Sequence, residues 1–532
     1  MTLLRRHIYH LTGVISLLVL FSISLYVRKD DLKTDLGRHH EWITAHALIT
    51  MEIWEKNGGP SAFGFNPIYT YPDAFVFPRR ALGGVTDENG WNYYVSYPPF
   101  AFIFGYYATQ LLGGPDVDSI RTLSVVIHFL CGLFLYLIFA EILARSQTYR
   151  FNFAGVLAAG IYYLSTGTLW AHSMLYFVDM PEQLWILMLL WMIVKAFGET
   201  RRPWLFISAL AILCFVASYT EWLGLFFAFF SGLLFLFFWF RKRKRIFLQS
   251  FLAIGISSTF ALGLTLIQYS SIAGWDGLYK SSVEKYEERG GFVTDNPHFI
   301  HHSGNPETFA MIRSVFDRQY QMAEHFFAVT TVLFIILLMV PATRRRLKDS
   351  KILMILLATP ICAIGLHYLL FINFNALHDF SAIKFGLMLA LCIGAMSHLI
   401  LTSLNGLKLK LTLGIGLVVL FVFTSRESVR RFHEKYSLAQ LDEEWLRSFK
   451  KIGALQEPDK AIFVDKFFVP EATWYCKRDY FPAYDSATVS ELMLGWHIPK
   501  AQYFVHEGSR LNYMVALENR DKKIHTIKMT DF

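Results

Sequence analysis

The sequence has few cysteines and few charged residues. Five cysteines occur in 532 residues, and four of them lie in or beside apolar segments. Neither a disulfide framework nor a cysteine-based zinc site can be assembled from them. Charged residues make up only 17% of the chain, and no phosphate-binding loop or dinucleotide-binding glycine motif is present. These absences argue against a disulfide-stabilised fold and against a nucleotide site.

Apolar side chains are abundant instead. Hydrophobic residues make up 54% of the sequence and aromatic residues 17%, and the mean hydropathy is +0.36. Many windows reach the roughly 20 apolar residues that cross a bilayer as a helix. The net charge of +8 comes from short basic runs between apolar segments, which is typical of cytoplasmic loops. The sequence therefore predicts an integral membrane protein that does not bind nucleic acid.

The positions of the basic runs predict the topology. Arg5 and Arg6 precede an apolar run at about residues 7–27, and no clear cleavage site follows, so we expect an uncleaved first span that begins in the cytoplasm. Alternation of basic loops then predicts an all-α protein of about eleven spans over residues 1–425. Residues 28–120 and 270–325 become large external loops.

Two other segments complete the expected architecture. Residues 97–112 are apolar but begin with a Pro-Pro pair and number only about 16, so we expect a surface-lying or re-entrant helix inside the first external loop. Residues 426–532 have soluble composition. A helical pattern at 443–455 and strand patterns at 461–464 and 502–505 predict a small extracytoplasmic α/β domain.

The first external loop contains a prominent acidic segment. Glu41 opens a helical pattern that stops at Gly58-Gly59-Pro60. On this pattern Trp42, Ala45, Ile49 and Ile53 share one face, which suits a helix lying on a membrane surface. Glu41 is expected in the first turn, where the helix dipole and free N–H groups favour an ionised carboxylate. The alternative is a solvated loop charge that caps the helix.

Three motifs in the first 240 residues resemble a known family. The first motif, residues 41–59, is a predicted surface helix headed by the acidic Glu41. The second is Tyr97-Pro98-Pro99-Phe100, followed by a short predicted helix and then by Arg121. The third is Asp179-Met180-Pro181, which opens the fourth span. In order and spacing they resemble the integral-membrane glycosyltransferases of the GT-C fold, especially the branch of protein O-mannosyltransferases and the lipid A aminoarabinose transferase (family 39-like). His40-Glu41 replaces that family's Asp-Glu pair, and Tyr97 replaces its His.

The resemblance implies an activity. Such an enzyme moves a monosaccharide from a polyprenyl-phosphate donor to an extracytoplasmic glycan, lipid or protein by inverting displacement. Glu41 would be the base, with Asp35 as the other candidate. No cofactor is expected, and a divalent cation is allowed but not indicated. A bacterial inner membrane with a periplasmic active site is expected. The alternatives are a transporter or flippase, or a polymer ligase, for lipid-linked glycans.

Further residues are candidates for binding the donor or the acceptor. They lie in the external loops or at the external ends of spans: Tyr97, Arg121, Asp179, Glu221, Arg313, Arg318, His378 and Lys384. Ionisable groups at such boundaries need a partner or a function. The structural alternatives are an N-cap role for Asp179, a boundary role beside Trp222 for Glu221, and snorkelling for Lys384.

Overall fold

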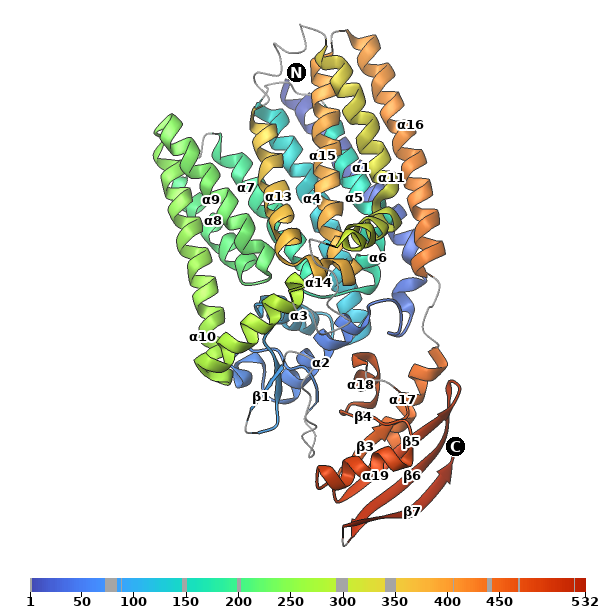
Figure 1. Cartoon of the computed structure of the whole chain (residues 1–532). Coiled ribbons are helices and arrows are strands. Elements are labelled where there is room, and N and C mark those ends of the chain that lie inside the picture. Colours follow the sequence, from blue (N-terminus) through green and yellow to red (C-terminus); the bar gives the residue numbers. More distant parts are fainter. Residues whose placement is uncertain are drawn as a thin grey trace. The chain divides into compact units, whose positions relative to one another are not determined.

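The structure is a computed structural model, and its described residues form two compact units. It describes residues 2–71, 84–87, 89–145, 151–198, 202–292, 305–339, 351–404, 406–437, 443–466, 469–520 and 522–532 (Figure 1). The membrane unit comprises residues 1–33, 121–267 and 282–437, and the loop–tail unit comprises residues 34–120, 268–281 and 438–532.

The membrane unit is built from apolar helices of different lengths, two of which also contribute residues 117–120 and 268–281 to the loop–tail unit. They are α1 (Thr2–Arg28), α4 (Val117–Arg145), α5 (Phe153–Leu164), α6 (Thr166–Met174), α7 (Asp179–Ala196), α8 (Pro203–Ser218), α9 (Trp222–Lys242), α10 (Arg245–Gly290), α11 (Pro306–Leu338), α13 (Lys351–Leu370), α14 (Ile372–Leu377), α15 (Ile383–Ser403) and α16 (Leu407–Phe432). Short turns η1 (Asp31–Lys33), η4 (Asp379–Ala382) and η5 (His433–Ser437) follow α1, precede α15 and follow α16. Helices predominate because a chain in lipid must satisfy its backbone hydrogen bonds internally.

The helices agree with the predicted spans. Among the described residues, seven helices are long and apolar enough to cross a membrane: α1, α4, α9, α10, α11, α15 and α16. The other four predicted spans coincide with α7 and with the shorter apolar helices α5, α8 and α13. The chain is a multi-pass membrane protein with a mainly helical fold, as predicted.

One predicted external turn is instead a buried helix. The apolar run at about residues 153–168 predicts the third span, and the alternation of basic loops predicts an external turn after it that carries His172. The structure ends α5 at Leu164, breaks at the extended Ser165, and continues as α6, in which every residue is buried. Helix α6 is bent by 118° from α7. The hydroxyl of Ser165 donates to the Ile161 carbonyl, which satisfies a carbonyl at the end of α5.

The loop–tail unit combines the first loop with the C-terminal region. The loop contributes α2 (Trp42–Lys56), η2 (Pro60–Phe63), β1 (Gly84–Thr86), β2 (Asn92–Tyr94) and α3 (Phe100–Gln110). The tail contributes α17 (Glu443–Leu455), β3 (Ala461–Val464), α18 (Pro470–Cys476), β4 (Phe481–Pro482), α19 (Ser486–Gly495), β5 (Lys500–Glu507), β6 (Arg510–Arg520) and β7 (Lys523–Asp531). Helix α3 has 11 residues, too few to cross a bilayer.

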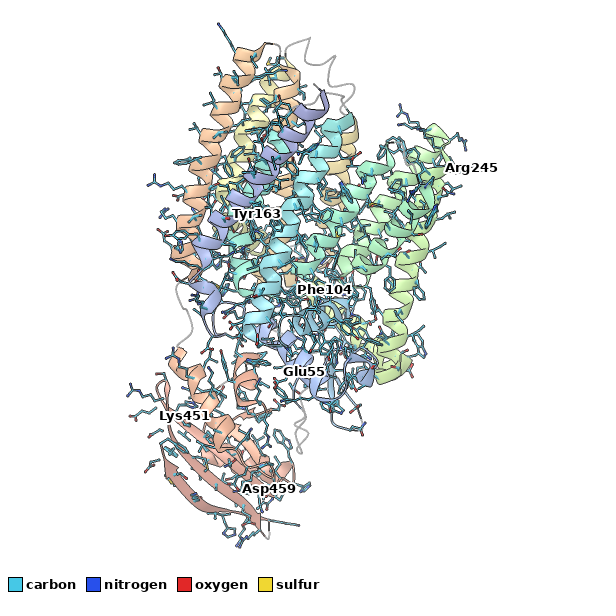
Figure 2. The ribbon with its side chains drawn as sticks, turned by 180° about the vertical axis from the view of Figure 1, so that it is seen from behind. Glu55, Phe104, Tyr163, Arg245, Lys451 and Asp459 are labelled. Atoms are coloured by element: carbon cyan, nitrogen blue, oxygen red, sulfur yellow. The ribbon has the colours of Figure 1, made fainter. Side chains whose placement is uncertain are left out.

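The tail is an α/β domain, as the sequence predicted. Its sheet has the order β4-β3-β5-β6-β7, with β4, β3 and β5 parallel and the rest antiparallel. One buried cluster contains Phe449 of α17 and Phe504 of the sheet, and a second contains Val489 of α19 and Phe463. Figure 2 shows the described side chains as sticks and labels Lys451 of α17 and Asp459, which precedes β3.

Helix α2 differs from the expected surface helix. Ala45, Ile49 and Ile53 are buried as predicted, but Thr44, His46 and most other residues of the helix are buried too. The α18 and α3 helices pack against it, and the Thr50 hydroxyl donates to the Ile68 carbonyl at 2.7 Å. The prediction of one-sided burial is therefore wrong, because tail residues distant in sequence cover the polar face.

Candidate functional site

Asp179 and Lys384 form a buried ion pair in the membrane unit. Asp179 is the first residue of α7, and Lys384 is the second residue of α15. Lys384 Nζ lies 2.6 Å from Asp179 Oδ1, and the two side chains are 0% and 1% exposed. A fully buried ammonium does not snorkel, so that alternative for Lys384 is excluded. Asp179 makes no side-chain cap of α7, which excludes the N-cap alternative as well.

Glu221 extends the pair into a chain across four helices. It is the N-cap of α9, where its Oε2 accepts from the Leu223 N–H at 2.6 Å. Its Oε1 lies 3.0 Å from Nε2 of His367 on α13 and 3.8 Å from Lys384 Nζ. The sequence analysis did not predict this capping role of Glu221, and the role does not account for the residue's contacts with His367 and Lys384. We call Asp179, Glu182, Glu221, His367 and Lys384 the buried charge cluster.

Glu182 adds a third carboxyl to this cluster. It follows Asp179 by three residues, which places both on one face of α7. Its side chain is fully buried, and both carboxyl oxygens lack a hydrogen-bond partner among the described residues. Asp179, Glu221 and Lys384 are its charged neighbours. The buried charge cluster therefore contains three carboxyl groups for one lysine.

The sequence predictions missed Glu182 and His367. Both had a signal that could have found them. Glu182 lies one helical turn after a boundary carboxylate, and His367 is an ionisable residue inside an apolar segment, which deserves a functional hypothesis by default. Glu221 and Lys384 lie at the starts of α9 and α15, and His367 lies near the end of α13. These ends are external in the predicted topology.

A second polar group surrounds Asp379 in the membrane unit. Arg318 Nη2 lies 3.7 Å from Asp379 Oδ2, and the arginine side chain is 43% exposed. Arg318 Nε lacks a hydrogen-bond partner among the described residues. His378 is half-buried and stacks on Phe380. Arg313 is bound in a bidentate pair to Glu324 at 2.7 and 2.8 Å, so its guanidinium is already occupied.

Arg28 lies at the end of α1 without a counter-ion among the described residues. It is 0% exposed, and its Nη1 donates to the His172 carbonyl at 3.3 Å. Nε and Nη2 have no hydrogen-bond partner in the part of the chain that the structure describes. The His172 ring stacks on His128 at 4.6 Å and lies 3.0 Å from the Tyr162 hydroxyl. Sequence reasoning missed this group, because α1 was considered only as a span.

Glu41 in the loop–tail unit is held by backbone amides. It is the N-cap of α2 rather than a first-turn residue, and its carboxylate is 0% exposed. Its Oε2 accepts from the N–H groups of Gly37 and Arg38, each at 2.8 Å. Gly37 has φ +144, and a Cβ there would clash with the Leu446 side chain, so glycine is favoured at this position. The partners that hold the carboxylate thus precede the helix, which corrects the predicted placement.

A tail carboxyl lies beside Glu41. Glu471 on α18 is fully buried, and burial together with the neighbouring Glu41 raises its pKa to about 8. Asp35, the other predicted base, is exposed and pairs with Lys450 of the tail at 3.0 Å. Both predicted bases therefore have a tail residue as a neighbour.

The remaining predicted residues are buried. Tyr97 is 2% exposed, and its carbonyl accepts a hydrogen bond from the Tyr269 hydroxyl within the loop–tail unit. Arg121 is also 2% exposed and begins the second segment of the membrane unit.

The carboxylates of the buried charge cluster are the oxygen ligands that hard cations prefer, but the ammonium of Lys384 supplies the positive charge between two of them.

The fold matches solved membrane proteins. No protein-family model and no curated protein matches the sequence. The chain is similar to the archaeal oligosaccharyltransferase AglB from Archaeoglobus fulgidus, solved with an inhibitory peptide and a dolichol-phosphate, with a TM-score of 0.54 and 12% identity over 92% of this chain and 69% of that one. It is similar to ArnT from Cupriavidus metallidurans bound to undecaprenyl phosphate, with a TM-score of 0.51 and 13% identity over 97% of each chain. The predicted GT-C fold is confirmed.

Proposed function

We propose that this chain is a membrane glycosyltransferase. It would transfer a monosaccharide from a polyprenyl-phosphate donor to an extracytoplasmic glycan, lipid or protein. The observation that carries the proposal is the likeness over 97% of both chains to ArnT, which was solved with undecaprenyl phosphate. AglB, the other neighbour, was solved with a dolichol-phosphate. The host membrane would be a bacterial inner membrane, with the reaction on the periplasmic side.

The proposed reaction is an inverting displacement. A hydroxyl or amine of the acceptor forms a bond to the anomeric carbon of the sugar, and the bond from that carbon to the phosphate oxygen breaks. The electron pair leaves with the polyprenyl phosphate, and a carboxylate accepts the acceptor's proton. Glu41 is the proposed carboxylate, because two backbone amides fix its orientation. The proposed reaction uses no cofactor.

Arg318 is the proposed contact for the donor phosphate. Its side chain is 43% exposed and pairs loosely with Asp379 at 3.7 Å, and its free Nε can still donate. A guanidinium binds phosphate with two parallel hydrogen bonds. Lys384 was predicted for the same role, but its burial and its 2.6 Å pair with Asp179 favour a positioning role.

A transfer assay tests the proposal. The purified full chain in lipid is incubated with labelled polyprenyl-phosphate sugars. We expect transfer by the wild type, and a loss of about 10²–10⁴-fold for Glu41→Gln, as expected for a general base. Arg318→Gln should lower transfer as well, because it removes the proposed phosphate contact. Glu55→Gln on the exposed end of α2 is the control for Glu41→Gln, and Arg430→Gln on the exposed face of α16 is the control for Arg318→Gln. Full activity of Glu41→Gln would refute the assigned base.

A transporter or flippase is the second candidate. One observation favours it: α6 and α7 form a helix pair bent by 118°, and broken helices with buried charges are typical of transporter sites. Movement of the labelled lipid across the bilayer without sugar transfer would establish this alternative. Use of lipid-diphosphate glycans alone would establish the polymer ligase.

A further inference from the structure

A groove opens at the end of the membrane unit that lies opposite Lys384 along α15. It has a volume of about 440 Å³ and is lined by residues of α4, α5, α15 and α16. Ser403 at the end of α15 and Leu407 at the start of α16 lie at this end, and so does Phe153 at the start of α5. In the predicted topology this is the side of the basic loops, where the cytoplasmic leaflet lies.

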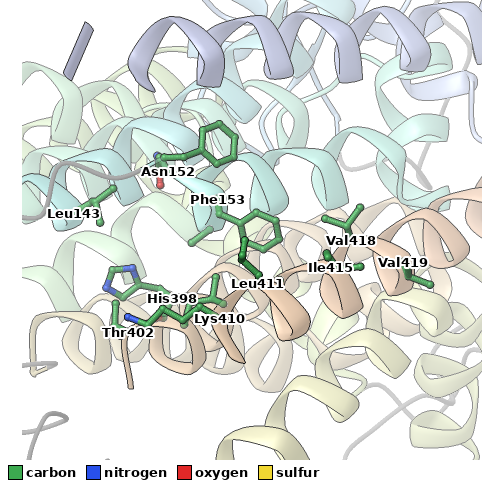
Figure 3. A pocket seen from close by; sticks show the side chains of 14 residues that line it. Leu143, Asn152, Phe153, His398, Thr402, Lys410, Leu411, Ile415, Val418 and Val419 are labelled. Atoms are coloured by element: carbon green, nitrogen blue, oxygen red, sulfur yellow. Dashed lines mark hydrogen bonds between the residues drawn. The ribbon is translucent and has the colours of Figure 1, made fainter. Parts of the chain in front are cut away.

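The lining of the groove has a polar end and an apolar end. His398, Thr402 and Lys410 gather at one end, and Leu411, Ile415, Val418 and Val419 continue from them along α16 (Figure 3). The Thr402 hydroxyl donates to the His398 carbonyl at 2.7 Å, so this threonine is fixed beside the histidine. A charged group next to a strip of aliphatic side chains is the arrangement that an amphiphile with an anionic head would match.

The dimensions fit one leaflet of a bilayer. Lys410 and Val419 are nine residues apart on a continuous helix, which corresponds to about 14 Å. Half of the hydrocarbon core measures about 15 Å. Leu411, Ile415 and Val419 are 55%, 64% and 63% exposed, so the apolar wall is open toward the lipid rather than closed inside the bundle.

We propose that this groove binds one anionic phospholipid of the leaflet on the basic-loop side. Its phosphate would contact Lys410, with His398 and Thr402 beside it, and one acyl chain would lie along α16. Charge complementarity selects this occupant, because the polar end presents a lysine, and basic pockets between helices on the cytoplasmic side bind anionic headgroups. The proposal does not depend on glycosyl transfer.

Two glycines of α16 give a matched test. Gly414 lines the groove and Gly416 does not. A Cβ at either position meets no atom within 4 Å, and neither glycine has a positive φ. Gly414→Phe should therefore fill the groove without straining the helix, and Gly416→Phe adds the same side chain elsewhere on α16. Both exchanges replace glycine by a better helix former, so both variants should fold.

Lipid retention is the measurement. The full chain is purified in detergent containing phosphatidylglycerol or phosphatidylcholine, and the bound lipid is counted by native mass spectrometry. We expect one retained phosphatidylglycerol in excess over phosphatidylcholine, its loss in Gly414→Phe and its retention in Gly416→Phe. Lys410→Gln should weaken phosphatidylglycerol binding about fivefold, the effect of one lysine near an anionic surface. Lys408→Gln, whose side chain is exposed and outside the groove, should not.

Three results would overturn the proposal. Equal retention of the two lipids would show that the lysine does not select an anionic head. Equal retention in Gly414→Phe and Gly416→Phe would place the bound lipid elsewhere. Displacement of phosphatidylglycerol by an equimolar amount of undecaprenyl phosphate would assign the groove to the polyprenyl carrier instead.

Discussion

Removing the lysine of the buried charge cluster should destabilise the membrane unit strongly. Lys384→Met keeps a side chain of similar length but leaves Asp179 and Glu221 without their cation. At an effective dielectric constant of about 20, a 2.6 Å separation corresponds to an attraction of about 6 kcal/mol. Desolvation of the two ions offsets part of this attraction. Loss of one partner of a buried pair then costs about 3–5 kcal/mol, because the other charge stays buried and uncompensated.

Thermal unfolding in detergent, followed by tryptophan fluorescence, measures the effect. We expect a much lower unfolding temperature for Lys384→Met than for Lys242→Met, which removes an exposed lysine at the end of α9. Asp179→Asn introduced into Lys384→Met should recover part of the loss, because it neutralises the stranded carboxylate. The reasoning is refuted if the unfolding temperature of Lys384→Met equals that of Lys242→Met. It is also refuted if the effects of Lys384→Met and Asp179→Asn on stability are simply additive in the double variant.

Three further results are expected, two from thermal unfolding and one from the transfer assay combined with thermal unfolding. The raised pKa of Glu471, from 4.5 to about 8, means that the folded state holds this proton more tightly than the unfolded state, so stability falls as pH rises from about 4.5 to about 8 and then levels off. The dependence of stability on pH should weaken in Glu471→Gln, and an unchanged profile would contradict the raised pKa of Glu471. Glu182→Gln should be at least as stable as the wild type, because its carboxyl has no hydrogen-bond partner among the described residues; a clear loss would imply a partner. Two nitrogens of the buried Arg28 guanidinium lack a hydrogen-bond partner among the described residues, so Arg28→Met should abolish sugar transfer but retain stability if an anion binds there. Lys29→Met, at an exposed neighbour, should change neither transfer nor stability, and a stable, fully active Arg28→Met would exclude the anion.

A second pH effect is expected at Glu52 of α2. Burial raises the pKa of this carboxyl, but hydrogen bonds from Lys477, Lys56 and Tyr71 outweigh burial and lower the pKa overall. The contribution to stability is therefore present above the unfolded value of 4.5 and is lost as pH falls through the lower folded value. Glu52→Gln should lower stability at pH 7 by about 1 kcal/mol, since Lys477 is partly exposed. Below the folded pKa of Glu52 the variant and the wild type should converge in thermal scans.

The sequence predicted the helical architecture well because lipid leaves few choices. A chain that crosses a bilayer must form helices of sufficient apolar length, and basic loops mark one side. Helix α17 and the strands β3 and β5 of the tail were predicted for a similar reason, since hydrophobic periodicity reports local structure, whereas β4, β6 and β7 were not predicted. The break at Ser165 was missed, because it depends on how α6 packs and not on local composition.

The candidate residues were harder to predict than the helices. Asp179, Glu221 and Lys384 stood out as charges at span ends, and each does have a buried partner. Which charges meet could not be predicted, because Asp179 and Lys384 are separated by about two hundred residues and the pairing is decided by how four helices pack.

The sequence by itself determined that this protein is a bundle of membrane helices with a soluble tail, because burial of apolar surface is encoded residue by residue. Only the tertiary structure decided how the charged groups are satisfied. Glu41 is held by the amides of a turn ahead of α2, Glu471 of the tail is its neighbour, and Glu182 has no hydrogen-bond partner among the described residues. Electrostatic interactions act through space, so side chains distant in sequence set the state of each charge.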